Sequence, residues 1–470
     1  MSVRVAILND CPVAEGARYA MRVLFEPLGV EVVEDLAADA DAWLRPDHLV
    51  VSYGPSPPEV RASRRIHIFS NDSFWKYYLR PEGLPPRPFA RVSLREAPVP
   101  LVVPFLGGSP AADPMVEWAR GAVFTRLDFV ASTFYFLTRY DEGFLGPRDA
   151  WGRVPEDRLA IVAEGLADRA PVDEYREVLR AWVARLLGHP LERPSRAFEL
   201  LLTHDVDSGF PGPLAPFLYF ATRGIARELL RHRSPRTALE LGWNTACASL
   251  GRPPWFGGVR DIVALAERHG LTSHFFFMAN GRHPDDATYR VESAGPASAV
   301  RFLRDAGHRV GLHAGIEAAG NPAEFEREWR VLREVLGREP HGVRTHFLCF
   351  DPLRTGRILD DVGVRMDSSA GFSNRCGFRT GTTHPHSLFD LEARRTLNVV
   401  EYPLALMDKA VYDLPPRARM EVVARIVETV RRHAGCLTVN WHYWYFTHRY
   451  RRLCEEVLAA ASGAQDARVP

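Results

Sequence analysis

The chain has 470 residues, with 59 Lys or Arg against 58 Asp or Glu, a near balance that removes the main electrostatic reason to expect a nucleic-acid-binding protein. Its six cysteines are scattered without a Cys-x-x-Cys pair, which argues against a zinc knuckle or a dense disulfide framework and favours free thiols in a reducing compartment. The length predicts two domains, each large enough to bury its own core.

The N-terminal region alternates strand and helix patterns. Short β-branched runs lie at 3–8, 30–33, 49–53 and 66–69, and an amphipathic segment lies at 17–28. This alternation predicts a small open α/β domain, and no Gly-x-Gly-x-x-Gly or Gly-Lys-Ser/Thr pattern supports a nucleotide site in it. The first residues lack the pattern of a secretory signal, and no apolar run approaches about 18 residues. We therefore expect a cytoplasmic chain, with peripheral contact to a membrane left open.

Two apolar helix patterns follow, at 128–139 and 173–187. A polar stretch with two prolines, 188–195, comes next and is the expected boundary between domains. We accordingly expect an N-terminal α/β accessory domain over residues 1–190 and a second domain over residues 196–470.

The second region alternates strand and helix patterns regularly. Its strand-like runs lie at 200–203, 272–277, 310–313, 342–345, 364–367, 398–402 and 437–440. Seven strands in this alternation predict a closed or nearly closed (β/α) barrel, that is, a distorted (β/α)7-type barrel behind the smaller open α/β domain. An open doubly wound sheet is the alternative.

Polar side chains follow the ends of these strands. In chain order they are Asp205, Asp207, Asn280, His313, Arg344, His346, Asp367, Glu401 and His442. Because the carboxyl ends of barrel strands converge on one mouth, we expect these side chains to share a site. The first two acids can divide the roles of base and metal ligand, whereas Asn280 and Glu401 fit structural roles better.

Each candidate also has a purely structural interpretation. The pair Asp205 and Asp207 could cap the turn after its strand, and His313 could be a buried histidine bonded to a backbone carbonyl. Arg344 could pair with an acid across the barrel, a role that would also orient Asp205. Aromatic packing could account for His442, which aromatic residues flank.

These motifs resemble those of the polysaccharide deacetylase family, carbohydrate esterase family 4. The family begins with Thr-Phe-Asp-Asp or, in some branches, with the Asp-x-Asp spacing seen at 203–207. Further matches follow in chain order: the Ala-Thr-Phe-Phe strand at 273–277, the Gly-His-Glu segment at 307–313, the Arg-x-Pro-Tyr motif at 342–347 and the final strand-end His at His442. The resemblance covers roughly residues 198–445.

The resemblance implies a metal-dependent hydrolase that removes N-acetyl groups from an amino sugar or glycan. It assigns Asp205 as general base, Asp207 and His313 as metal ligands, and His442 as general acid. Arg344 would keep Asp205 ionised. The implied partner is an N-acetylated sugar or glycan, free or linked to a lipid or nucleotide, and no nucleic acid is expected.

One departure from the family concerns the third metal ligand. The usual His-x-x-x-His pair is absent, because the fourth residue after His313 is Glu317. The third ligand is therefore Glu317 or His346, which stands where the family has proline. A carboxylate would favour manganese or magnesium, and an imidazole would suit zinc. We expect His346 and zinc, with manganese, cobalt or magnesium as alternatives, and a backbone N–H near Phe347 to hold the oxyanion.

Two further segments carry information. Residues 378–386 resemble a Phe-Arg-x-Gly-Thr stretch found in a subgroup of long deacetylase-like proteins with an extra N-terminal α/β domain. Residues 208–257 form an unusually long βα connection, with an aromatic run followed by arginines. This insertion is either a helical pair packed over the barrel or a lid or membrane-surface helix that receives an anionic or lipid-linked sugar carrier.

Two other functions stay open. A catalytically silent glycan-binding protein would keep the barrel without the full metal set, as the missing second histidine would allow. An amidohydrolase acting on a small non-sugar amide would keep the site and differ in substrate. Metal content separates the first from the deacetylase, and substrate profiling separates the second.

Overall fold

The structure is a computed structural model that describes residues 4–9, 11–34, 49–59, 64–108, 114–191, 198–207, 214–230, 233–249, 254–287, 289–443 and 448–462. The chain divides into two compact units, each built from separate stretches of sequence. Unit 1 comprises Met1–Pro147, Val154–Ala197 and Arg379–Leu397, and unit 2 comprises Arg148–Arg153, Phe198–Phe378 and Asn398–Pro470. The chain therefore passes between the units more than once. The expected boundary at 188–195 lies inside the second stretch of unit 1 and partly outside the described residues.

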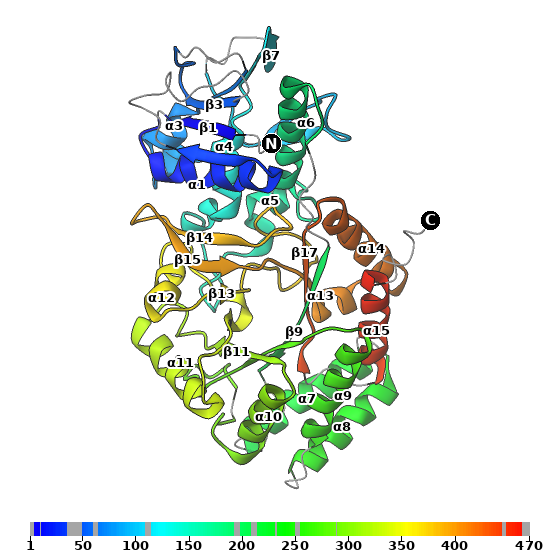
Figure 1. The fold of residues 1–470 in the computed structure, drawn as a ribbon. Coiled ribbons are helices and arrows are strands. Elements are labelled where there is room, and N and C mark those ends of the chain that lie inside the picture. The colour runs from blue at the N-terminus through cyan, green and yellow to red at the C-terminus, as the bar shows by residue number, and fades with distance from the viewer. Residues whose placement is uncertain are drawn as a thin grey trace. The chain divides into compact units, whose positions relative to one another are not determined.

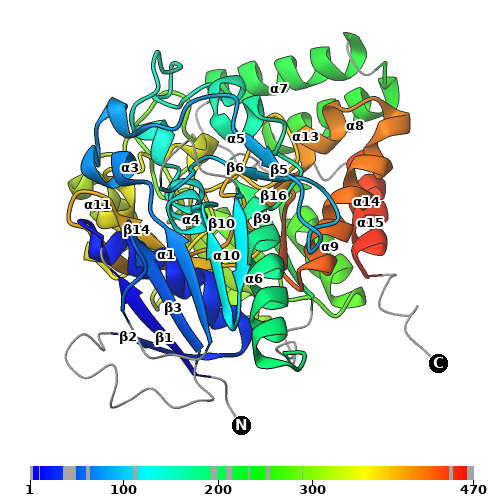
Figure 2. The same cartoon turned by 90° about the horizontal axis from the view of Figure 1, so that it is seen from above.

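Unit 1 contains an open six-stranded sheet in the order β2-β1-β3-β4-β8-β7, in which only β7 runs antiparallel to its neighbour. The strands are β1 (Arg4–Asn9), β2 (Glu31–Glu34), β3 (Leu49–Gly54), β4 (Arg65–Phe69), β7 (Val116–Ala119) and β8 (Ala122–Thr125). Figure 2 shows β1, β2 and β3 side by side in this sheet. A separate antiparallel pair is formed by β5 (Ala90–Val92) and β6 (Leu101–Val103). The strand patterns in the first part of the sequence thus correspond to real strands.

The helices of unit 1 are held by apolar faces and by their end residues. They are α1 (Ala14–Phe25), α3 (Asp72–Lys76), α4 (Phe129–Leu137), α5 (Ala160–Ala163) and α6 (Pro171–Leu187), with short 3-10 turns η1 (Glu26–Leu28), η2 (Pro81–Gly83), η3 (Tyr140–Gly143) and η4 (Glu156–Arg158). Every residue of α4 is buried, as expected for a helix that is apolar on all sides. Asp128 caps it by accepting a hydrogen bond from the Ala131 N–H at 2.8 Å.

Unit 2 is built on a curled, mainly parallel sheet of nine strands, in the order β14-β15-β13-β12-β11-β10-β9-β17-β16. The strands are β9 (Glu199–Val206), β10 (His274–Phe277), β11 (Arg309–Ala314), β12 (Val343–Thr345), β13 (Met366–Asp367), β14 (His386–Asp390), β15 (Arg395–Glu401), β16 (Leu404–Met407) and β17 (Cys436–Asn440). Of these, β14 and the first residues of β15 belong to the stretch Arg379–Leu397 of unit 1. All seven predicted strands are present, whereas β14 and β16 were missed.

The sheet curls because residues after β13 bond to β16, which stands near the other end of the strand order. A parallel bridge joins Gly371 to Leu404, and the Leu404 N–H donates to the Ala370 carbonyl at 3.0 Å. Glycine is required at 371, since a Cβ there would lie 2.7 Å from the Cβ of Leu404. The expected distorted (β/α)7 barrel is therefore found in the coarser form of a curled half-barrel.

Helices surround the curled sheet of unit 2 (Figure 1). They are α9 (Pro254–Arg268), α10 (Ala294–Asp305), α11 (Pro322–Leu336), α12 (Thr355–Val362), α13 (Asp408–Asp413), α14 (Pro416–Arg432) and α15 (His448–Ser462). Helix α11 shows why they form: Asn321 caps its N-terminus, and Gly337 ends it with φ of 73°. Its buried residues Phe325, Trp329, Leu332 and Leu336 lie on one face at helical spacing.

The long insertion contributes two further helices to unit 2. Helices α7 (Leu214–Leu230) and α8 (Pro235–Ser249) pack against each other. The aromatic run at 210–220 lies outside the residues whose side chains are described. Within the described part of the chain, no helix combines the length and the apolar character needed to cross a membrane.

Candidate active site

Asp205 lies near the end of β9, between β10 and β17, and is buried. Its Oδ1 accepts a hydrogen bond from Nη1 of Arg344 at 2.9 Å, and its Oδ2 accepts one from Nδ2 of Asn440 at 2.8 Å. Burial alone would raise the pKa of this carboxyl, but the charges of Arg344, His313 and His442 outweigh it and hold the pKa well below the usual range. Asp205 is therefore ionised and fixed in orientation.

Arg344 is fully buried at the end of β12 and is hydrogen-bonded along its whole guanidinium group. Nη1 donates to Thr203 Oγ1 at 2.7 Å as well as to Asp205, while Nε and Nη2 donate to the carbonyl and Oγ of Ser368, both at 2.8 Å. The guanidinium also lies 4.8 Å from the ring centre of Phe276. Arg344 thus pairs with Asp205 across the sheet and orients it, which is the structural role that the sequence analysis considered for this arginine.

His442 follows β17, and its Nε2 lies 3.9 Å from Oδ2 of both Asp205 and Asp207. Its Nδ1 lies 2.8 Å from Oδ1 of Asp408, and its backbone N–H donates to Oδ2 of Asp408 at 2.7 Å. Burial lowers the pKa of His442, but Asp408, with help from Asp207 and Asp205, raises it to about 10. The imidazole is therefore protonated at neutral pH and can donate a proton.

The sequence reasoning missed Asp408 and Asn440. Asp408 begins α13 directly after β16, a four-residue strand that begins only three residues after β15 ends. The signal was present but short: an apolar run, Leu404–Met407, that ends in an acid. Asn440 is the last residue of β17 and is fully buried. The signal for it in the sequence was a single amide side chain at the end of a mainly apolar strand.

His313 is buried near the end of β11, and one of its ring nitrogens is already hydrogen-bonded. Its Nδ1 lies 2.9 Å from the carbonyl oxygen of Arg344, and since a carbonyl only accepts, Nδ1 carries the proton. The other nitrogen, Nε2, lies 3.9 Å from Oδ2 of Asp205. Burial holds the pKa of His313 below its usual value in spite of Asp205 and Asp207 nearby, so the ring is neutral, the form that a metal ligand requires.

His346 lies in the turn after β12, and its ring centre is 5.2 Å from that of His313. Its Nδ1 lies 2.9 Å from Oδ1 of Asp286, a residue that the sequence reasoning did not select. Because Nδ1 is hydrogen-bonded to the Asp286 carboxylate, Nε2 is the atom left for metal coordination. Metal-bound histidines commonly have a carboxylate on their other ring nitrogen. Glu317, the other candidate for the third ligand, is exposed.

Asp207 follows β9 and has one oxygen without a partner. Its Oδ1 is buried and accepts no hydrogen bond within the described part of the chain, which is costly for a carboxylate and fits a cation. A carboxylate and two imidazole Nε2 atoms, from Asp207, His313 and His346, match in kind the donors that zinc prefers. In the described ranges, however, no three His, Cys, Asp or Glu side chains are arranged as a ready metal site. The metal centre therefore stays a prediction.

The remaining strand-end residues have structural partners. Asn280 donates to both carboxylate oxygens of Glu292, at 3.0 and 2.8 Å. Glu401 accepts a hydrogen bond from the Ala370 N–H at 3.1 Å. Asp367 accepts one from the hydroxyl of Ser369 at 2.6 Å. These contacts hold the strand ends in place and give Asn280 and Glu401 the structural roles expected of them.

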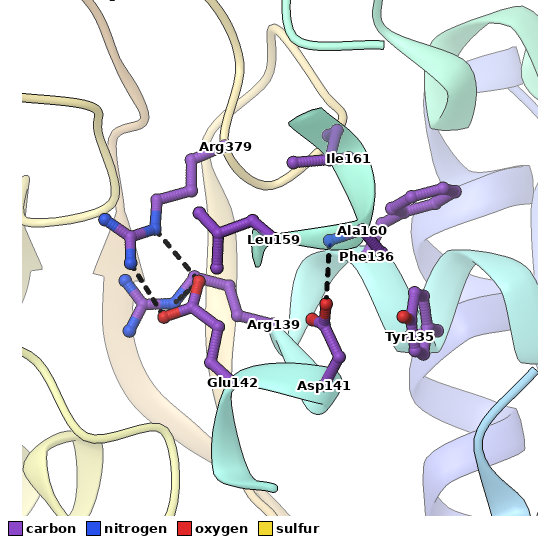
Figure 3. A pocket seen from close by; sticks show the side chains of 9 residues that line it. All are labelled: Tyr135, Phe136, Arg139, Asp141, Glu142, Leu159, Ala160, Ile161 and Arg379. Atoms are coloured by element: carbon purple, nitrogen blue, oxygen red, sulfur yellow. Dashed lines mark hydrogen bonds and ion pairs between the residues drawn. The ribbon is translucent and has the colours of Figure 1, made fainter. Parts of the chain in front are cut away.

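From Arg379 onward, the segment at 378–386 belongs to unit 1 rather than to the strand ends of unit 2. Arg379 donates to Glu142 through Nε at 2.9 Å and Nη2 at 2.8 Å, and Nε of Arg139 lies 3.5 Å from the same carboxylate. Figure 3 shows these three side chains pointing toward one another, whereas Asp141 turns to the N–H of Ala160. The pocket beside them has a volume of about 10 Å³, room for about one water molecule. The cluster is therefore a structural one.

Comparisons with known proteins give only distant similarity. Residues 11–187 match the model of a family of unknown function (DUF7033), a match that ends before β9. No curated protein sequence matches the chain. A structure from Mycobacterium smegmatis, provisionally named a polysaccharide deacetylase, is similar at 16% identity and a TM-score of 0.39, covering 58% of this chain and 87% of its own.

A second structure, from Parabacteroides distasonis, is provisionally named a glycoside hydrolase/deacetylase. It is similar at 9% identity and a TM-score of 0.34, covering 58% of this chain and 68% of its own. Neither TM-score reaches 0.5. The functional assignment therefore rests on the residues of this chain.

Proposed function

We propose that this chain is a metal-dependent hydrolase that removes N-acetyl groups from an amino sugar or glycan. The observation that carries the proposal is the pair Asp205 and His442, whose Oδ2 and Nε2 atoms lie 3.9 Å apart. One is an ionised carboxylate and the other a protonated imidazole at neutral pH. Hydrolysis of an amide requires a proton acceptor for the attacking water and a proton donor for the leaving nitrogen, and both face one point here.

The surrounding residues keep these two groups in their protonation states. Arg344 and Asn440 hold the Asp205 carboxylate by one hydrogen bond to each oxygen, so it is ready to accept the proton of the attacking water. Asp408 holds His442 with its protonated Nε2 directed at the leaving amine. Breakage of the C–N bond then leaves acetate and a free amino group, with the amine proton supplied by His442.

Asp207, His313 and His346 would hold the metal, and zinc suits this set best, with manganese, cobalt or magnesium as alternatives. A metal bound there supplies Lewis-acid polarisation of the amide carbonyl. This part of the proposal is supported by Oδ1 of Asp207, which has no hydrogen-bond partner among the described residues, and by the two imidazoles whose Nδ1 atoms are already hydrogen-bonded.

The test compares two neighbouring acids in metal-replete protein on a panel of N-acetylated sugars, oligosaccharides and small non-sugar amides. Asp205→Asn is expected to abolish acetate release and to keep the bound metal. Asp207→Asn is expected to lose both. If the wild-type chain releases no acetate from any sugar, or prefers the small amides, the proposed substrate class is wrong.

A glycan-binding protein without catalysis is the second candidate. It is favoured by Glu317, which replaces the second histidine of the usual metal pair and is exposed. Such a protein would bind glycans but retain no metal after metal-replete expression. Metal analysis of the purified chain decides between the two, because the hydrolase requires about one metal per chain.

We also propose that the helices α7 and α8 contact an anionic membrane surface, which would bring a lipid-linked substrate to the site. Among the described side chains of these helices, four large apolar ones are exposed: Leu229 at 46%, Leu230 at 82%, Leu239 at 75% and Trp243 at 70%. Leu239 and Trp243 lie one helical turn apart, Arg223 is exposed on α7, and the exposed Arg236 lies 3.2 Å from Glu240, one turn further along α8.

Liposome sedimentation tests this contact. The wild-type chain is expected to sediment with anionic vesicles at low salt, and Leu239→Glu with Trp243→Glu is expected to prevent it. Trp118→Ala, at a half-buried position in unit 1, serves as the control. A wild-type chain that stays in the supernatant leaves α7 and α8 as an accessory helical pair.

A further inference from the structure

A short segment of the sequence, Arg148–Arg153, belongs to unit 2 although the chain on both sides of it belongs to unit 1. Within unit 2 it lies against the turn that carries His346. The indole of Trp151 stacks on the ring of Phe347, with centres 4.5 Å apart and planes at 24°. Phe347 in turn stacks on His346, with centres 4.1 Å apart and planes at 18°. The three rings form one continuous aromatic stack, His346–Phe347–Trp151.

Two adjacent acids of one loop hold the ends of this aromatic stack. Nε1 of Trp151 donates to Oδ2 of Asp285 at 2.9 Å, and Nδ1 of His346 lies 2.9 Å from Oδ1 of Asp286. Because Asp285 and Asp286 are neighbours in the loop before α10, this loop holds both Trp151 and His346 in place. The indole is placed by directed bonds and not only by apolar packing.

Arg153 holds the middle of the aromatic stack. Its Nη1 donates to the carbonyl of Phe347 at 2.7 Å and to Oγ of Ser373 at 3.0 Å, while Nε donates to Oδ2 of Asp149 at 2.8 Å. Phe347 has φ of 52°, a left-handed conformation that is unfavourable for a bulky residue unless its surroundings hold it. Residues of the segment therefore help to impose the unusual backbone that turns Phe347 toward Trp151.

The aromatic stack reaches from the candidate metal ligands to a partly exposed surface. At one end, His346 contacts His313, whose Nε2 is 3.9 Å from Asp205. At the other end, Trp151 is only half-buried, and the guanidinium of Arg153 lies 4.8 Å from the centre of its ring. Flat aromatic faces beside charged hydrogen-bonding groups are the surfaces on which a sugar ring can lie, because its C–H groups meet the electron-rich face while its hydroxyls reach polar neighbours. Asp285 and Arg153 are such neighbours.

We propose that the outer side of the Trp151 indole forms a subsite for a sugar unit next to the one that reacts, and that Phe347, which has a ring on each of its faces, supports the indole from behind. The inference rests on the proposed function, which places the reacting N-acetyl group between Asp205 and His442. An oligosaccharide chain would then lie with its neighbouring unit on the indole. A residue from the segment between two parts of unit 1 would thus set the preference for an oligosaccharide over a single sugar.

The test uses the full chain with N-acetylglucosamine and its tetramer as probes. Trp151→Ala is expected to lower the ratio of kcat/KM for the tetramer to kcat/KM for the monosaccharide by about tenfold, mainly through KM for the tetramer. Trp151→Phe, which retains a ring on Phe347, is expected to recover most of that ratio. Trp118→Ala in unit 1 is the matched control. Trp118 is also half-buried, and the guanidinium of Arg185 lies 3.7 Å from the centre of its ring.

Calorimetric titration of the tetramer separates this inference from the proposed function. Tetramer binding that weakens about tenfold in Trp151→Ala, in a chain that releases no acetate, supports the subsite and contradicts the hydrolase. Acetate release with the same substrate ratio in wild type and Trp151→Ala contradicts the subsite alone. A wild-type chain that neither binds nor cleaves the tetramer overturns the subsite.

Metal content distinguishes a sugar contact from mere support of His346. The subsite requires that Trp151→Ala retain as much metal as the wild type. If Trp151→Ala and Trp151→Phe both lose metal in step with activity, Trp151 only positions His346, and the subsite is wrong.

Discussion

The carboxylate of Asp408 holds His442 at two points, through Nδ1 at 2.8 Å and through the backbone N–H at 2.7 Å. The first contact orients the ring and the second ties the carboxylate to the end of β17. The same carboxylate is the largest source of the raised pKa of His442, against the opposing effect of burial. Orientation and charge of the proton donor therefore depend on one residue at the start of a different element, the helix α13.

Asp408→Asn is expected to lower kcat by about 10²- to 10³-fold, because general acid catalysis contributes in that range. His442 acts as an acid only while protonated, and loss of the neighbouring charge lowers its pKa. The alkaline limb of the pH–rate profile should therefore move to lower pH. Asp413→Asn, on the same helix α13, is the control and should change kcat little. An unchanged alkaline limb in Asp408→Asn would show that His442 is not the titrating acid.

The third metal ligand can be decided by metal content. His346→Ala is expected to lose stoichiometric metal, since its Nε2 is left for coordination by the bond from Nδ1 to Asp286. Glu317→Gln, at an exposed position, should retain it. Asp286→Asn is expected to weaken metal affinity by about 10- to 100-fold, the usual effect of losing the partner behind a histidine ligand. Elemental analysis and competition with a chelator measure all three, and the reverse order for His346 and Glu317 would assign the carboxylate.

Much of the fold could be predicted because its signals are local. The apolar run before Asp205 marks a strand whichever partner it pairs with, and the spacing along α11 marks a helix. Asp205, His313, Arg344 and His442 could be chosen for the same reason, as polar residues at the ends of such runs. The structure brings these four together.

The parts that could not be predicted depend on contacts between distant residues. Asp408 gains its role only when β16 pairs with β17, and β16 is too short to show a period. Trp151 lies in an irregular segment and meets Phe347, a residue almost two hundred positions later. Arg379 was assigned to the barrel region by its place in the sequence, but its partner Glu142 lies in unit 1. Spacing along the chain contains no information about such pairs.

The buried cluster in Figure 3 should be important for the stability of unit 1. Glu142→Gln is expected to cost about 3 to 5 kcal/mol, because the loss of one member of a buried ion pair leaves Arg379 and Arg139 beside a neutral amide in place of their shared carboxylate. Faster amide hydrogen exchange in the segment Arg379–Leu397 would report the loss. Glu428→Gln removes an exposed ion pair with Arg432 and is the control, expected to change little. Equal effects of the two substitutions would contradict a structural role for the cluster.

The pH dependence of stability should contain a contribution from His386, which is buried in β14. Its Nδ1 lies 3.2 Å from the carbonyl oxygen of His384, and burial, reinforced by Arg176, lowers its pKa to about 4. In the unfolded chain the pKa of His386 is the ordinary value near 6.5. Between about pH 4 and pH 6.5 the unfolded chain therefore binds more protons than the folded chain. Stability is therefore lost as the pH falls from about 6.5 to about 4.

His386→Asn keeps a donor for the His384 carbonyl but does not titrate. Its free energy of unfolding should fall less steeply over this window, by up to about 1.4 kcal/mol per pH unit relative to the wild type. Urea denaturation at pH 7, 6 and 5 measures the difference in slope. His189→Asn, at an exposed position, is the matched control and should keep the wild-type slope. If His386→Asn also keeps that slope, His386 is not the buried neutral group that this structure describes.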